Sequence, residues 1–205
     1  MKYLVVFCLT GLLLGACVNH NQPTATTKDS LADTDSTTQK NNFFPVADFL
    51  ETEILAVDSA PLALCKYVVH GKEKQTDSSF ISVPAFNTLA REFLPAELRD
   101  SGLEKHFTES SFADRATRSI NFTYSPVDKD AALQRVDVMT MAGPRAQEVR
   151  SIYLEKRRVA GDSVIMQKLL WQAKHSFQII TLTRIKGGPP IEDQLRVVWN
   201  DGKDE

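Results

Sequence analysis

The chain has 205 residues, with 24 basic and 26 acidic side chains, 42% hydrophobic residues and three cysteines. This length fits one domain of ordinary size and leaves little room for a second. A net charge of −2 lacks the basic surplus that is typical of nucleic-acid-binding proteins, and nine glycines and nine prolines exclude a collagen-like repeat. We therefore expect one globular domain that does not bind nucleic acid.

The first seventeen residues have the features of a secretory signal. Lys2 is positively charged, and the twelve residues from Tyr3 to Leu14 form an apolar run. Twelve helical residues span about 18 Å, which is too short for a bilayer core of roughly 30 Å. A short apolar run between a positive start and small residues is typical of a cleaved export signal.

The signal ends in the sequence Leu14-Gly15-Ala16-Cys17. This sequence resembles the lipobox of bacterial lipoproteins, in which a leucine and two small residues precede the lipidated cysteine. The resemblance implies cleavage after Ala16, a diacylglyceryl thioether on Cys17 and a further acyl chain, such as palmitate, on the new amino group. The alternative is an ordinary signal peptide whose cleavage site happens to contain a cysteine.

Residues 18–42 have the composition of a flexible polar tether. They contain no aromatic side chain, and Val18 and Leu31 are their only aliphatic side chains larger than alanine. Such a segment does not bury enough apolar surface to offset the entropy cost of ordering it. We expect it to separate the folded domain from the membrane surface.

The residues that follow Cys17 also suggest a location. They resemble neither the aspartate signal that retains enteric lipoproteins in the inner membrane nor the acidic surface-export signal of Bacteroidota lipoproteins. We therefore expect an outer-membrane anchor that faces the periplasm. Two tether triplets, Asp29-Ser30-Leu31 and Asp35-Ser36-Thr37, resemble the O-glycosylation sites of Bacteroidota proteins.

Residues 43–205 are expected to form a single domain that begins with a helix over residues 43–57 and contains a second helix from Ser82 to Gly102. Both segments carry apolar residues at helical spacing, and Pro95 is expected to kink or restart the second. Between them, residues 62–69 are rich in aliphatic and β-branched side chains and predict a strand. The polar residues 72–79 predict an exposed loop or hairpin arm.

After the second helix the apolar pattern changes to alternation, which predicts strands. The expected strands cover residues 120–124, 133–141, 147–157, 163–171, 177–185 and 195–199. Short turns separate them, so neighbouring strands are expected to be antiparallel. We predict an α+β fold with two helices packed on an antiparallel β-meander of about five to seven strands. This element order loosely resembles cystatin-like and NTF2-like folds.

The chain lacks the motifs that usually identify an enzyme or a metal protein. There is no HExxH, CxxC, GxSxG, Walker or GxGxxG sequence, and His20, His70, His106 and His175 show no ligand spacing. Cys65 would be the one free thiol left after lipidation, and we expect it to be a small buried hydrophobic residue. We predict no catalytic residues, no metal site and no cofactor.

Two polar features are candidates for a binding surface. Lys156, Arg157 and Arg158 form the densest basic run, which could dock anionic lipid headgroups or polysaccharide, or could be a solvated hairpin tip. Arg135 and Asp137 are expected to share one face of a strand, where a half-solvated sheet face with cross-strand ion pairs is favoured over a catalytic site.

The strands over residues 163–171 and 177–185 carry bulky apolar residues on both faces. This pattern fits a central strand covered on both sides, a sheet with a lipophilic cavity, or a sheet with an exposed docking face. We therefore expect a non-enzymatic, membrane-anchored envelope lipoprotein whose domain binds a protein or cell-wall partner. The alternative is a periplasmic carrier for a hydrophobic small molecule or lipid.

Overall fold

The structure is a computed structural model that describes residues 43–71, 76–99, 103–143 and 147–200. The predicted lipid site Cys17, the signal segment and the tether lie outside the described residues. Residues from Lys40 to Glu205 group into one compact unit. In the part of the chain that is described, no helix has the length and apolarity needed to cross a membrane.

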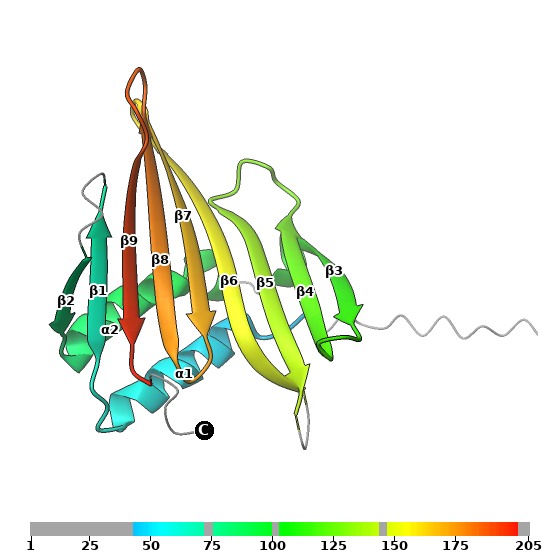
Figure 1. The fold of residues 1–205 in the computed structure, drawn as a ribbon. Helices are drawn as coiled ribbons and strands as arrows, with labels where there is room; N and C mark the ends of the chain where they lie inside the picture. The colour runs from blue at the N-terminus through cyan, green and yellow to red at the C-terminus, as the bar shows by residue number, and fades with distance from the viewer. Residues whose placement is uncertain (1–42, 72–75, 100–102, 144–146, 201–205) are drawn as a thin grey trace, which may run out of the picture. The chain divides into compact units, whose positions relative to one another are not determined.

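Within the described residues, nine strands form one antiparallel sheet (Figure 1). The strands are β1 (Cys65–His70), β2 (Thr76–Phe80), β3 (Phe107–Asp114), β4 (Ser119–Pro126), β5 (Leu133–Ala142), β6 (Gln147–Ala160), β7 (Ser163–Gln172), β8 (Ser176–Ile185) and β9 (Ile191–Val198). Their order is β2-β1-β9-β8-β7-β6-β5-β4-β3. The strands predicted from residue 120 onward are therefore confirmed as β4 to β9, connected by short turns.

The predicted α+β fold with two helices on a meander of about five to seven strands is wrong. The described chain is mostly β, with nine strands and only short helices. The sequence pattern missed β3 and treated β2 as a loop or hairpin arm because both are edge strands. Every residue of β2 is exposed, and β3 buries only Phe107, so neither strand shows the alternation of apolar residues that a half-buried strand requires.

The helical segments are shorter than the apolar spacing predicts. The first helix is α1 (Val46–Ser59), and the second is divided into α2 (Val83–Ala90), the 3-10 turn η1 (Arg91–Phe93) and α3 (Ala96–Arg99). Pro95 separates η1 from α3, as its missing amide donor dictates. A further 3-10 turn, η2 (Leu103–Lys105), precedes β3.

The core lies between the helices and one face of the sheet. An aromatic cluster fills its centre, where the Phe86 ring of α2 packs 6.4 Å from Trp171 and 5.5 Å from Trp199, measured between ring centroids. Phe93 and Phe177 complete the cluster, and all but Trp199 are fully buried. This packing explains why residues 171 and 177 face the helices and fixes which face of the sheet is covered.

Side-chain hydrogen bonds attach the helices to the sheet. Glu53 of α1 accepts hydrogen bonds from the Trp171 indole Nε1 at 3.3 Å and from the Lys174 backbone amide at 2.7 Å. The ammonium group of Lys156 on β6 donates to a Glu92 carboxylate oxygen at 2.7 Å and to the Glu92 carbonyl oxygen at 3.0 Å. These contacts place both helical layers on the same side of the sheet.

Candidate functional site

The sheet has one covered face and one open face. Successive residues of a strand point to opposite faces, so Leu169 and Trp171 of β7 face the core while Met166 and Leu170 point the other way. All the described helices lie behind the strands in the view of Figure 1, on the side of Leu169 and Trp171. We call the opposite side, which no described helix covers, the open face.

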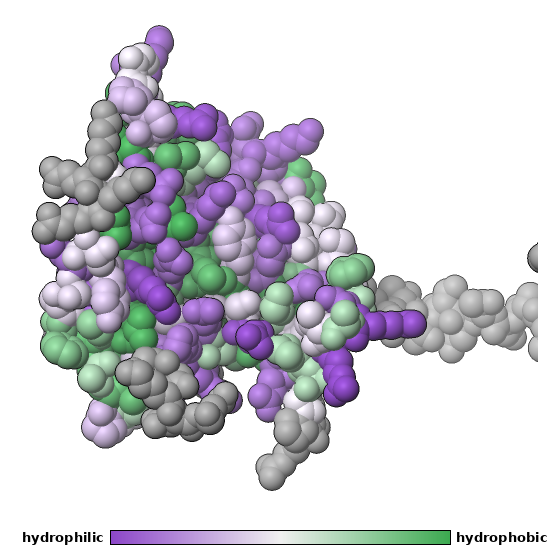
Figure 2. Space-filling model, in the orientation of Figure 1, coloured by the Kyte–Doolittle hydropathy of each residue, from purple (hydrophilic) through white to green (hydrophobic). Residues whose placement is uncertain are grey.

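The centre of the open face is apolar. Four partly buried side chains from β7 and β8 form it: Met166, Leu170, Ile180 and Leu182. One charged side chain, the exposed Lys168 of β7, lies among them, opposite Ile180. Met166 lies directly opposite Leu182 across the two strands. Figure 2 shows hydrophobic surface between hydrophilic side chains on this side of the molecule. The bulky residues predicted on both faces of these strands are thus divided between the core and the open face.

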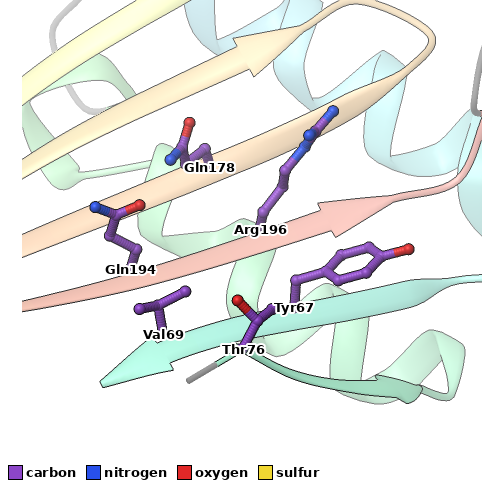
Figure 3. Close-up of a pocket in the computed structure, with 6 residues that line it drawn as sticks. All are labelled: Tyr67, Val69, Thr76, Gln178, Gln194 and Arg196. Carbon is purple, nitrogen blue, oxygen red and sulfur yellow. The ribbon is translucent and has the colours of Figure 1, made fainter. Parts of the chain in front are cut away.

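A pocket of about 340 Å³ lies at one side of this apolar centre. It is lined by Tyr67, Val69, Thr76, Gln178, Gln194 and Arg196, which come from β1, β2, β8 and β9 (Figure 3). The register explains the grouping, because Arg196 of β9 lies opposite Tyr67 of β1 on one side and Gln178 of β8 on the other. The pocket is therefore built on four hydrogen-bonded strands.

The polar side chains of the pocket differ in how they are held. The Gln194 amide Nε2 donates to a Glu192 carboxylate oxygen at 2.8 Å, which leaves the amide oxygen as an acceptor. Within the described residues, the Arg196 guanidinium makes no ion pair, and no hydrogen bond is formed by the Gln178 amide. The site thus combines a cationic group with amide donors and acceptors beside an aromatic ring.

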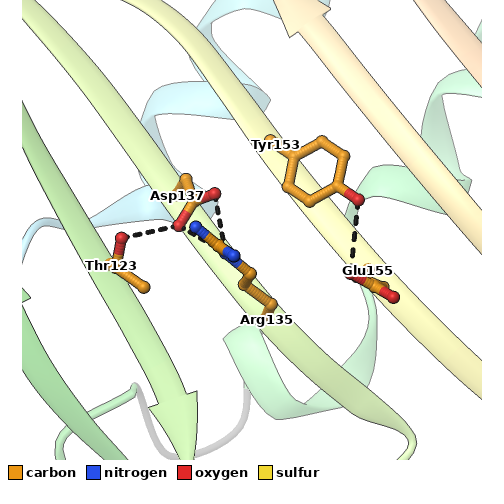
Figure 4. Close-up of polar contacts among 5 residues, drawn as sticks. All are labelled: Thr123, Arg135, Asp137, Tyr153 and Glu155. Atoms are coloured by element: carbon orange, nitrogen blue, oxygen red, sulfur yellow. Dashed lines mark hydrogen bonds and ion pairs between the residues drawn. The ribbon is translucent and has the colours of Figure 1, made fainter.

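A second polar group lies on the open face at the other side of the apolar centre (Figure 4). Arg135 Nε lies 2.9 Å from Asp137 Oδ1, to which it donates a hydrogen bond, and 2.8 Å from Asp137 Oδ2. The Thr123 hydroxyl also donates to Asp137 Oδ1, at 2.8 Å. The Asp137 hydrogen bond raises the pKa of Arg135. Arg135 and Asp137 share a face as expected, but their ion pair runs along one strand.

Tyr153 and Glu155 of β6 complete this group. The Tyr153 hydroxyl donates to Glu155 Oε2 at 3.3 Å. Partial burial and the neighbouring carboxylate raise the pKa of Tyr153 to about 12. The phenol therefore stays protonated near neutral pH, and the carboxylate of Asp137 is already neutralised by Arg135. These groups stabilise the sheet surface and offer hydrogen-bonding sites rather than an activated acid or base.

The predicted basic patch does not lie on one surface. Lys156 faces the helices, where its ammonium group is bonded to Glu92. Successive side chains along β6 point to opposite faces of the sheet. Arg158 therefore points to the same side as Lys156, and Arg157 points to the open face. Arg157 and Arg158 are both exposed. Strand geometry therefore separates the three cations that are adjacent in the sequence.

The remaining candidates from the sequence are the histidines and Cys65. Among the residues that the structure describes, no group of three His, Cys, Asp or Glu side chains could hold a metal ion. His70 Nδ1 lies 3.3 Å from Asp193 at an exposed position. Cys65 is a free thiol at the start of β1, and it is only partly buried, whereas the sequence predicted full burial.

The pocket on the open face was not identified from the sequence. Its two halves lie more than a hundred residues apart, at Tyr67 and Val69 on one side and Gln194 and Arg196 on the other. The alternation of Gln194 and Arg196 with apolar Leu195 and Val197 is a signal that they share a solvent-facing side. Only the pairing of β1 with β9 brings that side next to Tyr67.

Comparisons with known proteins give no relative for this chain: no family model, no curated protein and no solved structure matches it.

Proposed function

We propose that this chain is a non-enzymatic, lipid-anchored envelope protein that binds a partner through the open face of its sheet. The observation that carries the proposal is the apolar centre of that face, which lies between two polar groups. Partly exposed apolar residues in contact with one another, surrounded by polar side chains, are typical of binding surfaces. The partner is a protein or a component of the cell wall.

The rigidity of the open face supports this proposal. Its side chains stand on strands that are hydrogen-bonded on both sides, and Leu170 and Ile180 belong to adjacent central strands. A surface that is already ordered loses little conformational entropy when it binds. The polar group around Asp137 is also ordered before binding, because its carboxylate already has two partners.

The lipid anchor belongs to the same proposal. Acylation of Cys17 would hold the domain at the outer membrane, facing the periplasm, since two or three acyl chains give stable attachment. The polar residues 18–42 would let the domain reach partners near the membrane surface.

The alternative, a carrier for a hydrophobic molecule, has less support. Phe86, Phe93 and Trp171 fill the middle of the space between helices and sheet. The 340 Å³ pocket on the open face contains the Arg196 guanidinium and two glutamine amides, which do not favour an acyl chain. Another pocket, of about 260 Å³, lies beside the start of α1 and has Asp48, Arg99 and Glu104 in its lining.

Site-specific photo-crosslinking in intact cells tests the proposal. A photoreactive residue at Leu170 should give an adduct with one partner, and the same residue at Leu55, which is 64% exposed on α1, should not. Ile180→Lys should reduce the adduct from position 170 at least tenfold, since it removes an apolar side chain and places a second charge opposite Lys168. Equal adducts from positions 170 and 55, or no effect of Ile180→Lys in a folded protein, would contradict the proposal.

A further inference from the structure

We propose that the pocket formed by β1, β2, β8 and β9 binds a carboxylate-bearing sugar unit of an envelope polysaccharide. This inference rests on the proposed binding function and specifies its ligand. Each part of such a unit has a counterpart in the pocket: a cation for the carboxylate, amides and a hydroxyl for the sugar hydroxyls, and an aromatic ring for the apolar side of the sugar.

Arg196 provides the carboxylate recognition. Its guanidinium projects from the open face of β9 between Gln178 and Tyr67, and it has no ion pair within the described residues. A guanidinium group binds a carboxylate through two parallel hydrogen bonds. Another arginine of the open face, Arg135, already donates from Nε to the carboxylate of Asp137. Arg196 is thus the arginine of this pocket that is available for an anionic ligand.

The neighbouring polar side chains suit hydroxyl groups. A sugar hydroxyl both donates and accepts hydrogen bonds, and a glutamine amide offers both functions. Gln178 and Gln194 lie on adjacent strands, and the hydrogen bond from Gln194 to Glu192 fixes the orientation of its amide. The Thr76 hydroxyl reaches the same pocket from β2. These groups give the pocket more hydrogen-bonding capacity than a bare carboxylate would use.

The size and shape of the pocket fit a unit within a polymer. Its volume of about 340 Å³ is at the lower end of the range of small-ligand pockets, which is roughly 300–1,000 Å³. Tyr67, Thr76 and Arg196 are exposed, so the pocket opens to solvent and a unit of a polymer can enter it. Tyr67 and Val69 provide the apolar surface on which a sugar ring could lie.

Saturation-transfer NMR with the full-length protein in detergent tests this inference. Methyl β-D-glucuronide is the probe, and methyl β-D-glucoside is the matched sugar without the carboxylate. We expect the glucuronide to bind at least tenfold more tightly, because a hydrogen bond to a charged group contributes about 1.5–3 kcal/mol. Acetate, which has the carboxylate without the ring, should bind more weakly than the glucuronide.

Two arginine variants locate the site. Arg196→Gln should weaken glucuronide binding at least tenfold. Arg184→Gln removes the same charge from an exposed position on the same face of β8, outside the pocket, and should change binding less than twofold. Equal binding of glucuronide and glucoside, acetate binding as tight as glucuronide binding, or equal losses in the two variants would each overturn the inference. Circular dichroism and thermal unfolding confirm that both variants fold.

The two proposals fail in different ways. If the crosslink from position 170 forms but the glucuronide does not bind, the open face binds another kind of partner, such as an acidic protein segment, and only the sugar inference is overturned. If neither is observed, the proposed function fails as well.

Discussion

Tyr124 joins the beginning of the domain to its core. Its hydroxyl accepts a hydrogen bond from the Phe44 backbone amide at 3.1 Å, and the Phe43 ring stacks on it with 5.2 Å between centroids. The side chain is fully buried, and burial raises its pKa from the ordinary value of 10.0 to about 12. This single residue therefore ties the beginning of the domain to β4.

The raised pKa predicts a pH dependence of stability. Between pH 10 and 12 the unfolded chain releases the Tyr124 proton while the folded protein keeps it, so the free energy of unfolding should fall as pH rises through this window. Tyr124→Phe should cost about 1–3 kcal/mol below pH 10, because it leaves the Phe44 amide without its partner. It should also flatten the fall between pH 10 and 12.

Urea unfolding of both proteins across this range measures the effect. Tyr153, whose pKa is also about 12, remains in both proteins and serves as an internal control. Parallel pH profiles for wild type and Tyr124→Phe would contradict the prediction.

At the residue scale, the sequence predicted the direction of side chains better than the contacts that they make. The alternation around Asp137 correctly placed it on the same face as Arg135, because side-chain direction in a strand follows from position alone. The bond from Thr123 depends on the β4–β5 register, in which Thr123 lies opposite Asp137. The contact of Lys156 was also not predictable, because its partner Glu92 is 64 residues away and no local sequence pattern identifies that partner.

At the element scale, the covered face of the sheet depends on the aromatic cluster. Phe86 of α2 is fully buried against Trp171, Phe177 and Trp199. Because α2 is short, its attachment depends on this packing rather than on helix propensity. Phe86 is thus a main contact between α2 and the sheet.

Phe86→Ala should destabilise the protein by about 3–5 kcal/mol, since it removes buried contacts and leaves a cavity. Phe112→Ala on the edge strand β3 is the matched control, because that ring is 67% exposed, and it should change stability by less than about 0.5 kcal/mol. Chemical denaturation measures both changes. Similar losses in the two variants would show that the cluster is not the main attachment of α2.

The strands in which apolar and polar residues alternate regularly were predictable from the sequence, and the edge strands were not. The β7–β8 turn at Lys174 and the β6–β7 turn at Gly161 both have positive φ, and their turn-forming residues mark the strand ends in the sequence. In contrast, most residues of β3 are exposed to solvent, so apolar and polar residues do not alternate along this strand. Its pairing with β4 is determined by the chain reversal between them.

At the scale of the whole molecule, the proposed anchor and the proposed binding face lie in separate parts of the chain. The lipid would be on Cys17, and the open face begins with β1. Loss of the anchor should therefore change where the protein is located without changing its fold.

Cys17→Ala should move the protein from the membrane fraction to the soluble fraction of the periplasm, and the Tm of its domain should remain that of the wild type. Cys8→Ala is the control, because it removes a thiol from the signal segment and should leave the protein on the membrane. Fractionation with mass determination checks both variants. A membrane-bound Cys17→Ala protein would contradict lipid anchoring.

The position of β1 between β2 and β9 has a consequence for the order of folding. β1 is the first strand of the chain, yet its partner β9 is the last, and Lys66 pairs with Val197. Contacts between such distant residues form late, since the loop between them must close first. The pocket between β1 and β9 should therefore be absent from incomplete chains. Any ligand bound there would select finished molecules and stabilise the junction of the two ends of the domain.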